Sequence, residues 1–130
     1  MTISRAARFD AYTRTLREAN QSSFVDALEF VGRGTYRLLN VDVFEEHGWS
    51  TQAQRSRAQW RAGGLIKLMS RLFGEPEGVE NPPEICDPCV GKLDDELVAG
   101  LWSGTRITTI RDGVPFNLTA EQFLVSWHVG

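Results

Sequence analysis

A basic amphipathic stretch, Ser50 to Phe73, constrains the fold of this chain more than any other segment. Its apolar residues recur at steps of three and four, so at about 100° per residue they share one face of a helix that seeks a core. Ser50 or Thr51 is a suitable N-cap, and Gly74 is a suitable stop. The apolar stripe consists of Ala58, Ala62, Leu65, Ile66, Met69, Leu72 and Phe73.

The opposite face of the predicted helix carries Trp60, Lys67 and Arg71, with Gly63-Gly64 between them. Each glycine weakens a helix by about 1 kcal/mol, so we expect a kink there or a second helix that begins near Leu65. A solvated basic face would account for the pattern, but Trp and Arg also anchor interfaces. The candidate partner-binding residues are Trp60, Lys67, Arg71, Arg55 and Arg57.

Periodicity predicts further helices before and after this stretch. Residues 3–19 and a second segment capped by Ser22 or Ser23 both show helical spacing, and Gly32-Arg33-Gly34 is expected to end the second. Residues 35–44 are compatible with either a strand or a short helix. Leu93 to Leu101 is predicted to be a short helix, because acidic residues occupy its first turn.

The C-terminal part contains a predicted β-hairpin. Residues 106–110 and 114–118 alternate, and Asp112-Gly113 between them is a favoured two-residue turn. Pro115 cannot donate a backbone hydrogen bond, which favours an edge strand. Thr119 and Gln122 form a capping-box pattern, which predicts a final helix that buries Phe123, Leu124 and Trp127.

Together these elements predict an α+β fold: a helix-dominated single domain over residues 1–130, with a C-terminal β-hairpin and a capping helix. A chain of 130 residues can bury a core without disulfides or metals. The predicted core residues are Phe24, Leu28, Val31, Leu65, Met69, Leu72, Phe123 and Trp127.

An acidic loop, rich in proline and glycine, is predicted at residues 74–92. Residues 74–101 contain eight acids and a single lysine, directly after a stretch with five cations and no acid. Opposite charges attract, so we expect the acidic segment to lie near the basic helix, in the same chain or in a symmetric partner.

Cys86 and Cys89 form a C-x₂-C pair, which supplies half of a zinc site. His47 and His128 are the only histidines and could complete the four ligands, although neither has the usual finger spacing. A thioredoxin-type redox role would need a βαβ frame that is missing here. The alternative is a proline turn with two ordinary thiols, and no other cofactor is expected.

Composition favours a cytoplasmic, intracellular protein. No apolar run is long enough to span a bilayer, and the N-terminus lacks the apolar segment of a secretory signal. We found no nucleophile–base arrangement and no phosphate-binding glycine loop. We therefore expect a non-enzymatic interaction protein, a small subunit or regulator that docks on another macromolecule; a virus or mobile element would suit such a chain as its source.

Two alternatives remain open at this point. The helix over residues 50–73 could bind nucleic acid, although the pI near 5.4 argues against it. A zinc-stabilised module through Cys86 and Cys89 is the other. A protein partner is expected first, and a homo-oligomer is compatible with the charge pattern.

Overall fold

The computed structural model describes residues 4–18, 26–111 and 113–129. These residues form an α+β fold in which helix exceeds strand, as predicted. The helices are α1 (Arg5–Glu18), α2 (Ala27–Leu39), α3 (Val43–Glu46), α4 (Gln52–Ala62) and α5 (Leu65–Phe73). The strands are β1 (Pro88–Leu93), β2 (Glu96–Trp102), β3 (Ile107–Arg111), β4 (Val114–Leu118) and β5 (Phe123–Ser126), with a 3-10 turn, η1 (Ala120–Gln122), before β5.

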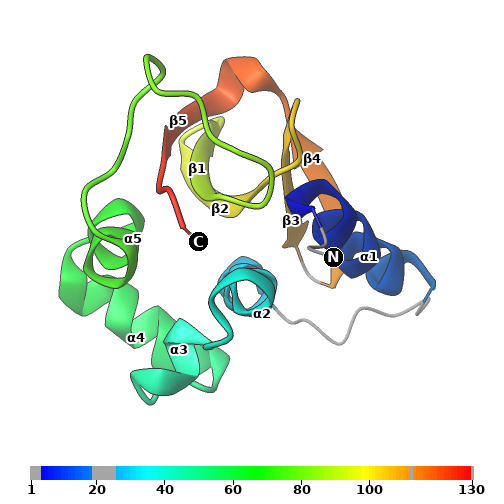
Figure 1. The fold of residues 1–130 in the computed structure, drawn as a ribbon. Coiled ribbons are helices and arrows are strands. Elements are labelled where there is room, and N and C mark those ends of the chain that lie inside the picture. Colours follow the sequence, from blue (N-terminus) through cyan, green and yellow to red (C-terminus); the bar gives the residue numbers. More distant parts are fainter. Residues whose placement is uncertain (1–3, 19–25, 112, 130) are drawn as a thin grey trace.

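The strands form one antiparallel sheet in the order β4-β3-β2-β1-β5. Helix α2 packs against β2 and β3. Figure 1 shows α2 beside the sheet, with α1 on one side of it and α3, α4 and α5 on the other. The helices therefore gather on one face of the sheet.

Helix α2 is longer than the sequence predicted, because its two glycines are packing sites and not terminators. A Cβ atom on Gly34 would come within 2.2 Å of Leu101 Cδ1, and one on Gly32 within 2.7 Å of the Phe44 ring. The helix continues to Leu39 and ends at Asn40, which adopts a left-handed conformation with φ 57°. The strand alternative for residues 35–44 is therefore wrong. The predicted caps Ser22 and Ser23 lie outside the described residues.

The acidic loop is shorter than predicted, because its last residues enter the sheet as β1. Leu93 pairs with Glu96, so Asp94 and Asp95 make a two-residue hairpin turn in which Asp94 has φ 54°. The helix predicted over Leu93–Leu101 is therefore wrong. The acids that suggested a helix start belong to a tight turn, where aspartate tolerates a left-handed backbone.

At the C-terminus the predicted hairpin is confirmed, and β4 is an edge strand. Thr119 and Gln122 do form the capping box, but it opens only the turn η1. The predicted capping helix is replaced by β5, which pairs with β1. The segment forms a strand because its β-branched and aromatic side chains favour pairing with the free edge of β1. This preference is stronger than the helix start that the capping box favours.

The core has two parts, one on each face of the sheet. The larger part lies between the helices and the sheet and includes Trp127, Leu68 and Leu101, while the smaller part contains Cys89, Val98, Ile107 and Leu118. Of the predicted core, Phe24 lies outside the described residues, Leu72 and Phe123 are partly buried, and five are buried as predicted: Leu28, Val31, Leu65, Met69 and Trp127.

Candidate functional site

The candidate site lies on the helix pair α4–α5. Residues close in sequence determine where each of these helices begins and ends. Thr51 caps α4, and its capping box is completed by Gln54. The helix ends at Gly63 with φ 93°, and Gly64 begins α5, so the predicted second helix starting near Leu65 is confirmed. The buried residues Ala58, Ala62, Leu65, Leu68 and Met69 fix both helices onto the core.

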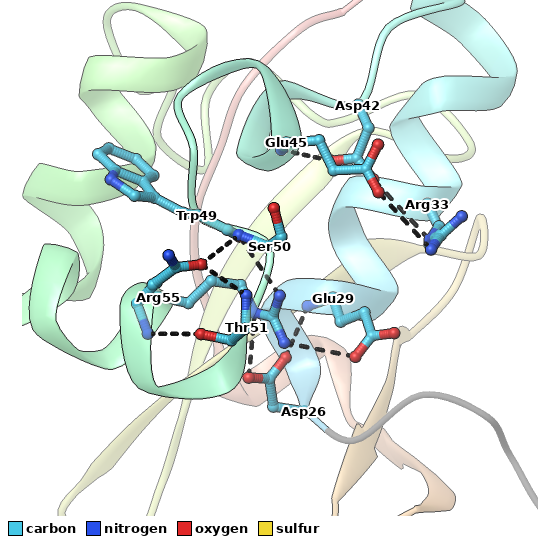
Figure 2. A network of polar contacts seen from close by, with 10 residues as sticks. Asp26, Glu29, Arg33, Asp42, Glu45, Trp49, Ser50, Thr51 and Arg55 are labelled. Carbon is cyan, nitrogen blue, oxygen red and sulfur yellow. Dashed lines mark hydrogen bonds and ion pairs between the residues drawn. The ribbon is translucent and has the colours of Figure 1, made fainter.

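Arg55 does not belong to the docking surface that the sequence suggested. Its side chain is 4% exposed, and it binds Asp26 Oδ2 at 3.2 Å and Glu29 Oε2 at 3.3 Å (Figure 2). Its guanidinium also donates to the Trp49 carbonyl oxygen at 3.4 Å. Arg55 thus joins α4 to the first turn of α2, and its role is structural.

The four other cations of α4–α5 are exposed. Arg57, Arg61, Lys67 and Arg71 all project into solvent, and within residues 4–18, 26–111 and 113–129 none of them forms an ion pair. No internal ion pair has to be broken when an anion approaches these cations. The basic face predicted from the sequence is therefore present, without Arg55.

Three of these arginines converge on one hollow of about 420 Å³, here called the arginine pocket. Arg57 and Arg61 reach it from α4 and Arg71 reaches it from α5. The pocket lining contains no aspartate or glutamate, and its other residues are His47, Gly48, Trp49, Gln54 and Ala58. Trp49 and Gln54 were not predicted as site residues, and His47 was considered only as a candidate zinc ligand. The i, i+4 spacing of Arg57 and Arg61 was the available sequence signal for the pocket.

Trp60 lies on the neighbouring flank of α4. Its side chain is 82% exposed, and it lines a second hollow, the Trp60 hollow, with Ser56, Gln59, Gly63 and Gly64. The Lys67 side chain lies close to Gly63, since a Cβ atom there would be 3.3 Å from its Cδ. Tryptophan side chains are highly buried on average, so Trp60 is unusually exposed for its type. The predicted patch of an indole, two glycines and a cation is therefore assembled.

The two cysteines do not form a shared metal site. Both thiols are buried, and they belong to the two different core clusters. Cys86 Sγ faces the Gly34 carbonyl and Cys89 Sγ faces the Gly100 carbonyl. Burial raises the pKa of Cys86 to about 11 and the pKa of Cys89 well above its ordinary value. Burial therefore disfavours the thiolate form in which cysteine binds zinc.

The histidines are also placed apart from the thiols. His47 Nδ1 contacts the Val43 carbonyl oxygen at 2.8 Å, and its ring stacks on Trp49. His128 Nδ1 lies 3.0 Å from Asp87 Oδ2. No group of three potential metal ligands occurs in the described part of the chain. The predicted zinc set of Cys86, Cys89, His47 and His128 is therefore not brought together.

The acidic segment pairs with other parts of the protein. Buried Asp87 binds Arg5 of α1 at 2.6 Å, Glu84 binds the same arginine at 3.1 Å, and Glu96 binds Arg111 of β3 at 2.8 Å. Among the described residues, no ion pair joins this segment to the cations of α4–α5. The two segments do meet, since residues 96–99 line one hollow with Gln52, Ser56 and Gln59 of α4. The predicted charge pairing between them within one chain is not formed among the described residues.

Comparison with other proteins does not supply a family. No protein-family model, no curated protein and no solved structure matches this chain. Among the described residues, no helix is both long and apolar enough to cross a membrane. The surface of α4–α5 is therefore the candidate functional site.

Proposed function

We propose that this protein is a non-enzymatic interaction protein, a small subunit or regulator, that docks on another protein in the cytoplasm through α4–α5. The observation that carries the proposal is Trp60, which is 82% exposed and lines a hollow with Gly63, next to which the unpaired Lys67 lies. Indole and guanidinium groups dominate the energetics of protein interfaces, and an indole gains most from burial against a partner.

Charge favours a protein partner over nucleic acid. The formal net charge is −3, and nucleic-acid-binding domains are usually basic. The four exposed cations of α4–α5 form a local patch on an acidic molecule. Such a patch suits an acidic surface on a protein partner, where complementary potentials speed association and fix orientation.

The test is a pull-down in which the bound protein is identified and its affinity is then measured. Trp60→Ala should weaken binding by at least about 30-fold, because interface anchors contribute about 2 kcal/mol or more. The control is Arg106→Gln, which alters an exposed arginine on the β2–β3 connection. Equal affinity of Trp60→Ala and the unaltered protein would contradict docking through this face.

Nucleic-acid binding is the second candidate, since four exposed cations remain available on α4–α5. If all four contacted phosphates on duplex DNA, the log–log dependence of affinity on salt would have a slope of about −3.6. A gel-shift experiment at low salt measures it. No retardation would remove this candidate and leave the protein partner. Light scattering on the purified protein tests for a homo-oligomer.

A further inference from the structure

The arginine pocket offers almost only hydrogen-bond donors. Gln54 Oε1 accepts hydrogen bonds from the backbone N–H groups of Ser50 at 2.9 Å and Thr51 at 3.0 Å. The acceptor atom of this side chain is therefore occupied, and its NH₂ group is left to donate to a ligand. Arginine side chains have five N–H donors and no acceptor. The indole of Trp49 likewise only donates. A ligand for this pocket must therefore supply acceptors.

Charge requires that ligand to be an anion of more than one charge. Arg57, Arg61 and Arg71 bring three positive charges to a lining with no carboxylate. The acids nearest in sequence are Glu45 and Glu46, and neither lines the pocket; Glu45 lies 3.7 Å from Arg33. One carboxylate would offset a single charge. A phosphate monoester carries about −1.5 to −2 at pH 7 and presents three strong acceptor oxygens.

Contacts within the protein hold part of the pocket lining in place. Arg57 and Arg61 are one turn apart on α4, and buried Ala58 forms the floor between them and the core. Also in the lining, the His47 ring stacks on Trp49 at 4.9 Å between ring centroids. His47 Nδ1 faces a carbonyl oxygen, which only accepts, so this nitrogen holds a proton and the ring orientation is fixed. Guanidinium groups can bind phosphate oxygens in a bidentate manner.

We propose that the arginine pocket binds a phosphate monoester carried by the docking partner, namely a phosphoserine or phosphothreonine side chain. This inference rests on the proposed function, because the phosphate arrives on a protein. A hollow of about 420 Å³ holds such a side chain with its adjoining backbone. The Trp60 hollow, on the next flank of the same helix, then receives an apolar side chain of the same peptide.

Nucleic acid fits this geometry less well. Each phosphodiester carries one negative charge, and successive phosphates form a track that a protein follows with spaced cations. Here three of the four exposed cations of α4–α5 meet in one hollow, while Lys67 stands apart beside Gly63. A concentrated site of this kind suits one dianion.

The test is an NMR titration of ¹⁵N-labelled protein with three probes: N-acetyl-O-phosphoserine N-methylamide, N-acetylglutamate N-methylamide, and inorganic phosphate. The phosphoserine probe should shift the signals of residues 47–49 and 54–61 and the Nε–Hε signals of the pocket arginines. It should bind at least about tenfold more tightly than the glutamate probe, since it has greater charge and more acceptor oxygens.

Arg61→Gln should weaken binding of the phosphoserine probe at least tenfold, while Arg106→Gln should leave it unchanged. Both residues are exposed, so circular dichroism should show unchanged folding for both variants. Equal affinity for phosphoserine and glutamate, or equal effects of the two variants, would overturn the inference. Inorganic phosphate binding as tightly as the phosphoserine probe would mean that the pocket recognises free phosphate, and it would overturn the inference as well.

A phosphatase experiment separates this inference from the proposed function. Dephosphorylation of the captured partner should weaken its binding to this protein at least tenfold. The remaining affinity should equal that of the phosphorylated partner for the Arg61→Gln variant. If dephosphorylation changes nothing while Trp60→Ala still abolishes docking, the phosphate inference fails and the docking proposal stands. If the phosphoserine probe binds but no protein docks on α4–α5, the docking proposal and the partner-borne phosphate fail together.

Discussion

Replacing Arg55 by alanine should destabilise the protein by about 3 kcal/mol. Arg55 makes three charge-assisted contacts of 3.2, 3.3 and 3.4 Å, to Asp26, Glu29 and the Trp49 carbonyl. Removing one partner of a buried ion pair costs about 3–5 kcal/mol. The low end applies because the two carboxylate side chains keep 19% and 22% of their surface exposed and part of their hydration.

Urea unfolding followed by tryptophan fluorescence measures this loss, which corresponds to a drop of about 12 °C in melting temperature for a chain of this size. The matched control is Arg57→Ala, two residues along the same helix. Arg57 is exposed and forms no ion pair among the described residues, so its replacement should change stability by less than about 0.5 kcal/mol.

A double-mutant cycle then tests whether the ion pair is the cause. Glu29→Gln should cost more in the unaltered protein than in the Arg55→Ala background, with a coupling energy of about 1 kcal/mol. A coupling energy near zero would mean that the contact with Glu29 contributes nothing to stability, and that Arg55 acts through Asp26, the Trp49 carbonyl or the packing of its aliphatic stem. If Arg55→Ala is no more damaging than Arg57→Ala, the structural role assigned to Arg55 is wrong.

Three further substitutions or conditions test the core. Trp127→Ala should lower the free energy of unfolding in urea by about 3–5 kcal/mol, because the side chain is fully buried and its indole donates to the Gly74 carbonyl oxygen at 3.0 Å. Trp60 is exposed, so Trp60→Ala should lower it by less than about 0.5 kcal/mol. Stability should fall as the pH rises from 9 towards 11, because the pKa of the Cys86 thiol is about 11 in the folded protein and near 9.0 in the unfolded chain. Urea unfolding at a series of pH values measures this fall in the free energy of unfolding. Cys86→Ser should make the fall less steep. Gly34→Ala should lower the melting temperature despite alanine's better helix propensity, because its Cβ would meet Leu101. Leu101→Ala should then cost less stability in the Gly34→Ala chain than in the unaltered protein.

The sequence predicted those elements whose signals are local. The break between α4 and α5 depends on Gly63-Gly64, and the β3–β4 hairpin depends on a two-residue turn and alternation, all within a few residues. Strands β1, β2 and β5 could not be recognised in this way. Their stability comes from pairing with distant segments, such as Cys89 with Ser126, and tertiary pairing overrides weak local preferences.

The burial of Arg55 could have been foreseen from helical spacing. It precedes Ala58 by three residues and Ala62 by seven, so it lies at the edge of the apolar stripe and not on the solvent face. What the sequence could not supply is the identity of its partners, because Asp26 and Glu29 belong to another helix. The same limit applies to the arginine pocket, in which Arg71 joins Arg57 only after α5 folds back on α4.

The separation of charge in the fold explains why α4–α5 is the surface to test. An acidic loop laid over this face would compete with any anionic ligand at high effective concentration. Instead Glu84 and Asp87 pair with Arg5, and Glu96 pairs with Arg111, so these acids are engaged elsewhere. The cations of the arginine pocket then face solvent with their charge uncompensated by the described residues. An anionic group on a partner therefore meets a site that needs no internal ion pair to be broken first.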